Sequence, residues 1–117
     1  MTLSLENVTI DCTDPRVLAG FWTQALGWTV TVDFDGEYLV LSSADEKGTS
    51  LSLQRVAEPR QGKNRVHVDL AADDRGAEVR RLVGLGATEL AEHEVPGLTW
   101  TVLADPEGNE FCVSQHD

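Results

Sequence analysis

Cysteine and basic residues are scarce in this chain, and each shortage excludes a class of protein. Only Cys12 and Cys112 occur among 117 residues, which is too few for a disulfide scaffold, and they form no CxxC pair. Nine lysines and arginines stand against 20 aspartates and glutamates, so the formal net charge is −11. Such a charge repels phosphate backbones and anionic lipids. We therefore expect no nucleic-acid partner and no binding to a membrane surface.

The sequence also lacks long apolar runs, a leader and the common catalytic motifs. No apolar stretch approaches the roughly 20 residues that span a bilayer. The start, Met-Thr-Leu-Ser-Leu-Glu, has neither the basic residues nor the apolar run of a secretion signal. No glycine-rich phosphate loop and no Ser-His-Asp motif is recognisable. These observations predict a cytoplasmic, reduced protein.

What the chain does contain is one structural pattern that occurs twice. In the first half we expect a strand, a helix capped by Asp14-Pro15 and Gly27, and three further strands, at 5–12, 15–26, 28–34, 37–43 and 49–56. In the second half, Asp73 or Asp74 opens the helix and Gly86 closes it. The expected strands there lie at 65–71, 88–92, 98–103 and 109–114. Each half therefore reads βαβββ.

Landmarks in the two halves match at an offset of about 60 residues, which indicates an internal duplication. Leu26-Gly27 corresponds to Leu85-Gly86, and the turn at 45–48 corresponds to the turn at 105–108. We therefore predict a single domain, 1–117, made of module 1–60 and module 61–117.

This plan resembles the vicinal oxygen chelate superfamily, which includes glyoxalase I, extradiol dioxygenases and the bleomycin-resistance proteins. The resemblance is carried by the Asp14-Pro15 helix start, by the Leu26-Gly27-Trp28 and Leu85-Gly86-Ala87 helix ends, and by Asp-Pro-Glu-Gly-Asn-Glu-Phe at 105–111. It implies an α+β fold in which the two modules form a curved eight-stranded mixed sheet around a cleft, with the helices on the outside. It also implies a homodimer and a small organic ligand.

The resemblance implies four metal-ligand positions in the metal-dependent members, on the first and last strand of each half. Here these positions fall on Asn7, on Ser52 or Gln54, on His67 and on Cys112, and only His67 has the usual ligand type. A hard divalent cation needs several oxygen or imidazole ligands, preferably anionic ones. We therefore predict no cofactor and no metal ligands. The alternative is a displaced divalent metal near His67 that uses Cys112, Asp69 or Glu110.

Alternation along residues 65–70 directs His67 and Asp69 to one face of the expected strand and Val66, Val68 and Leu70 to the other. By the resemblance, the polar face lines the cleft. We expect His67 either to act on a ligand or to form a structural hydrogen bond with Asp69. We expect His93 and His116 to be solvated. The predicted ligand-binding residues are Asn7, Gln54, His67, Trp100 and Cys112.

These observations predict a small-molecule-binding protein of the glyoxalase and bleomycin-resistance type with a metal-free cleft. Trp100 either stacks on a flat ligand or packs in the core or a dimer contact. The alternative is a divergent lyase, isomerase or dioxygenase, whose catalytic residues would be His67, Asp69 and Glu110 and which either uses or lacks a metal. A dimer with a vestigial pocket is a third hypothesis. The sequence does not identify the ligand.

Overall fold

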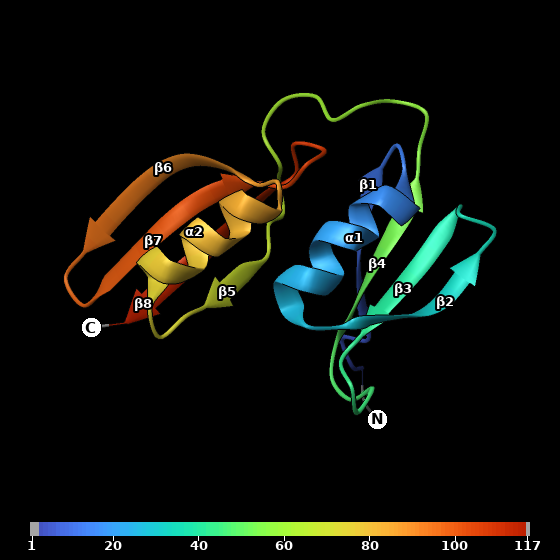
Figure 1. Cartoon of the computed structure of the whole chain (residues 1–117), viewed down its shortest axis with the longest axis horizontal. Coiled ribbons are helices and arrows are strands. Elements are labelled where there is room, and N and C mark those ends of the chain that lie inside the picture. Colours follow the sequence, from blue (N-terminus) through green and yellow to red (C-terminus); the bar gives the residue numbers. More distant parts are fainter. Residues whose placement is uncertain (1–2, 117) are drawn as a thin grey trace. The chain divides into compact units, whose positions relative to one another are not determined.

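The computed structural model describes residues 3–116, and the chain divides into two compact units, with the boundary between Arg60 and Gln61. The first unit contains β1 (Asn7–Cys12), α1 (Pro15–Leu26), β2 (Thr29–Phe34), β3 (Tyr38–Ser42) and β4 (Ser50–Arg55). The second contains β5 (Asp69–Ala71), α2 (Arg75–Leu85), β6 (Thr88–Val95), β7 (Leu98–Ala104) and β8 (Glu110–His116). Both units have the predicted βαβββ order (Figure 1).

Each unit builds one four-stranded mixed sheet, and the two sheets have the same topology. The strand orders are β1-β4-β3-β2 and β5-β8-β7-β6. The first strand of each unit pairs in parallel with the last, and the remaining pairs are antiparallel. The helix between the first two strands packs on one face of its own sheet (Figure 1). The prediction of an α+β fold from two βαβββ modules with eight strands is confirmed for residues 3–116.

Both helices begin and end where the sequence predicts. Asp14 accepts a hydrogen bond from the backbone N–H of Val17, Pro15 is the first residue of α1, and Gly27 ends the helix with a φ of 70°. In α2 the cap is Asp74, which accepts from the N–H of Ala77. Within the described residues, neither helix is long and apolar enough to cross a membrane.

The core of each unit lies between its helix and one sheet face. In the first unit, Leu18 and Trp22 of α1 are fully buried against Leu39, Leu41 and Leu53. The residues that fill the second core are Val79, Leu82, Leu103, Phe111 and Val113. The opposite sheet face of each unit carries the polar side chains that alternate with these residues.

Matching turns join the last two strands of each unit. Asp45 accepts hydrogen bonds from the hydroxyl of Ser43 and the N–H of Lys47. Asp105 accepts from the N–H groups of Glu107 and Asn109, both at 2.9 Å. Asp105 is buried, whereas Asp45 is exposed, so the second turn is held more firmly.

The first strand of the second unit is shorter than the sequence predicts. The expected strand at 65–71 is reduced to Asp69–Ala71, and Val66, expected on the covered face, is 75% exposed. In the register of β5 and β8, Arg65 and Val66 would lie beyond Glu110, where β8 begins, so they have no ladder partner. His67 therefore lies just before β5 and not within it.

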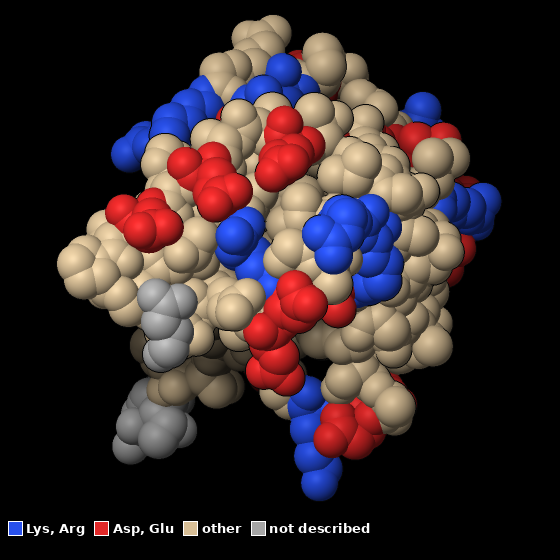
Figure 2. All heavy atoms as spheres, turned by 60° about the vertical axis from the view of Figure 1, so that its left-hand side comes forward, with Lys and Arg blue, Asp and Glu red and all other residues tan. Residues whose placement is uncertain are grey.

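Charged side chains of both signs are mixed over the face drawn in Figure 2. Acidic and basic groups lie next to one another there, and neither sign forms a continuous patch. On this face the net charge of −11 is therefore spread out. This arrangement favours solubility and does not form a charged docking surface.

Candidate functional site

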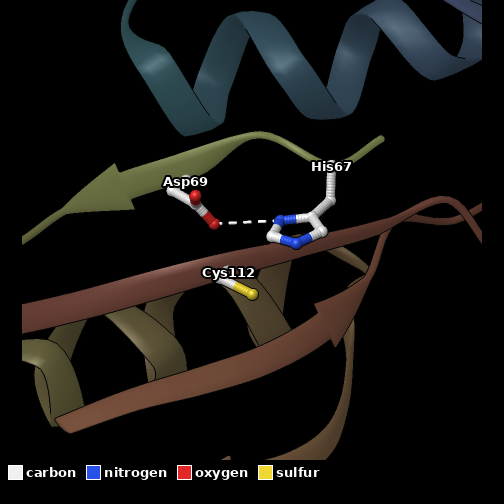
Figure 3. Close-up of side chains that lie close together, drawn as sticks. All are labelled: His67, Asp69 and Cys112. Atoms are coloured by element: carbon white, nitrogen blue, oxygen red, sulfur yellow. Dashed lines mark hydrogen bonds and ion pairs between the residues drawn. The ribbon is translucent and has the colours of Figure 1, made fainter. Parts of the chain in front are cut away.

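Three of the predicted site residues meet at the start of β5 and β8. Asp69 and Cys112 are direct partners in the parallel register of these strands. His67 precedes Asp69 by two residues and lies on the same side, because the backbone N–H of Cys112 donates to the carbonyl of Val68 and extends the pairing. Figure 3 shows the side chains of His67, Asp69 and Cys112 directed toward one another.

The imidazole of His67 is hydrogen-bonded to the carboxylate of Asp69. Nδ1 of His67 lies 3.0 Å from Oδ1 of Asp69 (Figure 3). In the neutral ring the Nδ1–H donates to the carboxylate, and Nε2 is left with a free lone pair. The side chains of His67 and Asp69 are 41% and 63% exposed, so both are open to solvent and to an incoming ligand. The predicted Asp69 contact is present, and it leaves His67 able to accept a proton.

The thiol of Cys112 lies deeper, at the base of this cluster. Cys112 is 7% exposed. Burial raises the pKa of its thiol, and the nearby carboxylates of Asp69 and Glu110 raise the pKa further. The thiol therefore stays protonated near neutral pH, which argues against a nucleophilic cysteine activated by His67.

The three side chains together form a compact set of potential metal ligands. One donor atom from each of His67, Asp69 and Cys112 lies within 4.8 Å of the other two. Among residues 3–116 this is the one group of at least three His, Cys, Asp or Glu side chains with such spacing. The set combines nitrogen, oxygen and sulfur donors, a combination found at zinc sites.

This cluster forms one side of a groove of about 690 Å³ on the exposed face of the second sheet. The volume is within the range of roughly 300–1,000 Å³ that is typical of ligand sites. The other side of the groove consists of β6 and β7 residues that are apolar except for His93, namely Leu90, Ala91, His93, Leu98, Trp100 and Val102. The side that comes from β5, β8 and the residues before β5 is polar except for Phe111, and consists of Lys63, His67, Asp69, Glu110, Phe111, Cys112, Ser114 and His116. The groove is thus divided between an apolar and a titratable half.

An aromatic pair lies in the apolar half. The rings of His93 and Trp100 are 5.2 Å apart and inclined by 29°, so they stack. They face each other because His93 and Trp100 are register partners in the β6–β7 hairpin. Trp100 therefore lines the groove together with His93.

All three histidines of the chain line this groove, although only His67 is expected there from the sequence. His93 and His116 are exposed, as expected from the sequence, and the new finding is that both also line the groove. The β6 strand extends to Val95 and the β8 strand to His116, further than the expected strands at 88–92 and 109–114, and this brings both residues onto the sheet. Extending the alternation of the last hairpin by a few residues would have identified them.

The equivalent positions of the first unit carry a different chemistry. The register pairs Thr9 with Ser52 in the same way as it pairs Asp69 with Cys112, so Ser52, and not Gln54, is the counterpart of Cys112. The hydroxyl of Ser52 donates to Oδ1 of Asn7 at 2.7 Å, and the amide of Asn7 donates to the hydroxyl of Tyr38 at 2.9 Å. The neutral polar side chains of Asn7, Ser52 and Tyr38 therefore form hydrogen bonds with one another.

Tyr38 is the aromatic member of that polar cluster. Hydrogen bonding from Ser52, and then from Thr9 and Asn7, lowers the pKa of its hydroxyl. Tyr38 pairs with Gln54 as Trp100 pairs with Ser114, so Tyr38 is the counterpart of Trp100.

The predicted site residues thus separate into two groups. His67, Asp69, Trp100, Glu110 and Cys112 line the groove of the second unit. Asn7 and Gln54 belong to β1 and β4 of the first unit, where Gln54 is exposed. Asn7 and Ser52 have no ionisable group and are engaged with each other, so they fit poorly as half of a four-ligand metal centre.

Comparisons with known proteins show that the chain belongs to a known domain family. Residues 7–114 match the family model described as glyoxalase-like domain. A glyoxalase/bleomycin resistance protein/dioxygenase family enzyme from Burkholderia phytofirmans PsJN has a similar structure, with a TM-score of 0.81 at 19% sequence identity, over 98% of this chain and 100% of that chain. No curated protein sequence matches the chain.

Two further solved structures have the same fold. A lactoylglutathione lyase from Agrobacterium tumefaciens gives a TM-score of 0.72 at 16% identity, over 98% of this chain and 95% of that chain. A glyoxalase/bleomycin resistance protein from Albidiferax ferrireducens T118 gives 0.71 at 18% identity, over 96% and 98%. At these identities the likeness establishes the fold alone.

Proposed function

Because the chain belongs to the glyoxalase-like domain family of the vicinal oxygen chelate superfamily, we propose that it binds a small organic molecule in the groove of its second unit. The observation that carries this proposal is the division of the groove. Trp100 and Val102 offer a flat apolar surface, and Asp69 and Glu110 offer carboxylates opposite it. A ligand with a flat ring and a cationic or hydrogen-bonding head group matches both halves.

The proposed mechanism is sequestration, in which the groove holds the molecule without transforming it. An aromatic ring would stack against Trp100, and the polar end would face His67 and Asp69. The four-ligand metal centre of the metal-dependent relatives is not needed for these contacts. We propose that ligand binding continues in the presence of a chelator, in line with the metal-free cleft expected from the sequence.

A thermal-shift screen of aromatic antibiotics, α-keto acids and thiol adducts tests this proposal. We expect at least one flat compound to raise the unfolding temperature, and we expect Trp100→Ala to weaken its binding about tenfold or more. Trp28→Ala is the matched control, because Trp28 lies in the first unit and is absent from the groove lining. The proposal would be contradicted if a compound raised the unfolding temperature of both variants equally, or if no compound raised that of the wild-type protein.

The hydrogen bond between His67 and Asp69 favours a second candidate function, which is proton transfer by a lyase or isomerase. In this function His67 is the general base, acting through Nε2, and Asp69 orients the ring. Glu110 lines the same groove and supplies a second carboxylate as an acid. If a compound from the screen is turned over, His67→Ala should lower kcat about 100-fold or more. Turnover that is unchanged in His67→Ala would exclude this function.

We also propose that the protein is a homodimer, as its family resemblance implies. Strands β2 and β6 are at the edges of their sheets and carry exposed apolar side chains such as Phe34 and Val95. Size-exclusion chromatography with light scattering should give twice the mass of the chain. A strictly monomeric profile across concentrations would contradict this proposal.

A further inference from the structure

We propose that the groove of the second unit selects an aromatic zwitterion, a molecule in which a short chain links a flat ring to both a cationic amine and an acidic group. This inference rests on the proposed function, because it concerns the ligand of the same groove. Three features of the groove wall carry it, namely the carboxylate of Glu110, the ammonium of Lys63 and the stacked rings of His93 and Trp100.

Lys63 and Glu110 bring opposite charges to the same side of the groove. Among the described residues neither of them forms an ion pair, whereas the carboxylate of Asp69 is already hydrogen-bonded to His67. Both charges lie near the thiol of Cys112. The pKa of this thiol is raised first by burial and by Asp69 and then by Glu110, and it is lowered by Lys63. The groove therefore offers one anionic and one cationic group without a partner of its own.

This pair of opposite charges discriminates between ligands by their charge. A purely cationic ligand would pair with Glu110 but would bring its charge close to the ammonium of Lys63. A purely anionic ligand would pair with Lys63 but would face the carboxylates of Glu110 and Asp69. A zwitterion pairs its amine with Glu110 and its acidic group with Lys63, and hydrogen bonds between charged groups are the strong ones.

The register of the sheet sets the distance between the ring and the charged groups of the ligand. Trp100 pairs with Ser114 and Val102 pairs with Cys112, so the aromatic pair lies two residues along β8 from the thiol. Two strand residues cover about 7 Å. A ring that carries a chain of two or three carbon atoms, as in the aromatic amino acids, matches this distance.

Three indoles that share one ring test the charge preference. L-Tryptophan carries both charges, tryptamine carries only the amine and indole-3-propionate carries only the acid. The full-length ¹⁵N-labelled chain is titrated with each compound at a slightly alkaline pH, where histidine is mostly neutral. The Kd is obtained from the shift of the Trp100 indole N–H signal. We expect L-tryptophan to bind at least about tenfold more tightly than either of the other two compounds.

Two variants separate the contributions of the two charges. Lys63→Gln should weaken the binding of L-tryptophan about tenfold without weakening that of tryptamine, and Glu110→Gln should weaken both compounds without weakening indole-3-propionate. Both variants should fold, because Lys63 is exposed and Glu110 is half-buried. Lys47→Gln is the matched control, since Lys47 is the only other lysine of the chain and lies in the first unit. It should change none of the three affinities.

The possible outcomes distinguish this inference from the proposed function. The charge preference would be overturned if L-tryptophan bound no more tightly than tryptamine or indole-3-propionate, or if its affinity were unchanged in Lys63→Gln. Shifts of the Trp100 signal would then still support a ligand groove. If none of the three indoles shifted that signal, the inference would also be overturned, whereas the proposed function would fail only if no compound of the thermal-shift screen stabilised the protein.

Discussion

The two units of this protein share one backbone plan but carry different chemistry on the same positions. Residues 60 apart correspond, so that Asn7, Thr9 and Ser52 match His67, Asp69 and Cys112. The first set is neutral, and its side chains are hydrogen-bonded within the unit. The second set contains an imidazole, a carboxylate and a thiol beside an open groove.

The aromatic pairs in the two units follow the same rule. Phe34 and Tyr38 are register partners in the first hairpin, with rings 6.4 Å apart, and His93 and Trp100 are their counterparts in the second. The duplicated backbone therefore determines where side chains meet. Which residues occupy those positions determines whether the result is a hydrogen-bonded network of neutral groups or a groove lined by titratable groups.

The largest expected effect on stability comes from removing a large side chain from either core. Trp22→Ala and Phe111→Ala should each lower the free energy of unfolding by about 3–5 kcal/mol, because both side chains are almost completely buried. Hydrogen exchange should accelerate mainly in the unit that carries the substitution. Faster exchange in both units from either substitution would mean that they unfold as one, and would weaken a unit-by-unit comparison.

The two matching turns, at Asp45 and at Asp105, should lose different amounts of stability when the aspartate is removed. Asp105→Ala removes the acceptor for two backbone N–H groups from a buried position and should cost about 1.5–3 kcal/mol, measured by urea unfolding. Asp45→Ala, at the exposed counterpart, should change the midpoint little. Equal losses would show that burial does not separate the two turns.

Tyr38 reports on the polar network of the first unit, and it is the only tyrosine in the chain. Its pKa is lowered in the folded protein, so tyrosinate absorbance should begin to rise below the ordinary tyrosine pKa of 10.0. The matching contribution to stability is present above that value and is lost as the pH falls through the lowered pKa. Ser52→Ala should raise the pKa toward 10.0. An unchanged titration in this variant would contradict the assigned network.

The smallest effect is expected at the ion pair between Arg16 of α1 and Asp33 of β2, at 3.0 Å. Hydrogen bonding from Arg16, and then from the N–H of Gly36, lowers the pKa of Asp33. Any stabilisation is therefore present above pH 3.8 and is lost as the pH falls below it. Both side chains are exposed, so Asp33→Asn should shift the thermal midpoint only slightly, and less in high salt.

Most of the fold could be predicted because its signals are local. Asp14, Pro15 and Gly27 define one helix, and the repeated turn defines the duplication. The extent of β5 could not be predicted from alternation, since it depends on where β8 begins. Val17 lies at the helical spacing of the buried Phe21 but is itself 69% exposed, because helical spacing does not reveal how far the sheet extends beneath the helix.

The candidate site could be predicted only in part, for a related reason. Strand alternation identifies which side His67 and Asp69 face, and the repeat identifies Cys112 as the partner position. The stacking of His93 on Trp100 was missed because the expected strand ended at residue 92. In the structure β6 runs to Val95, and the turn that follows it sets the register that pairs His93 with Trp100. The choice between Ser52 and Gln54 likewise required the pairing of β1 with β4.

The most direct test of a functional groove in the second unit uses the three tryptophan indole N–H signals in a ¹⁵N–¹H correlation spectrum. Trp22 and Trp28 belong to the first unit, and Trp100 lines the groove. Compounds that raise the unfolding temperature should shift the Trp100 signal most. Compounds that stabilise the protein while moving only the Trp22 or Trp28 signal would contradict the account.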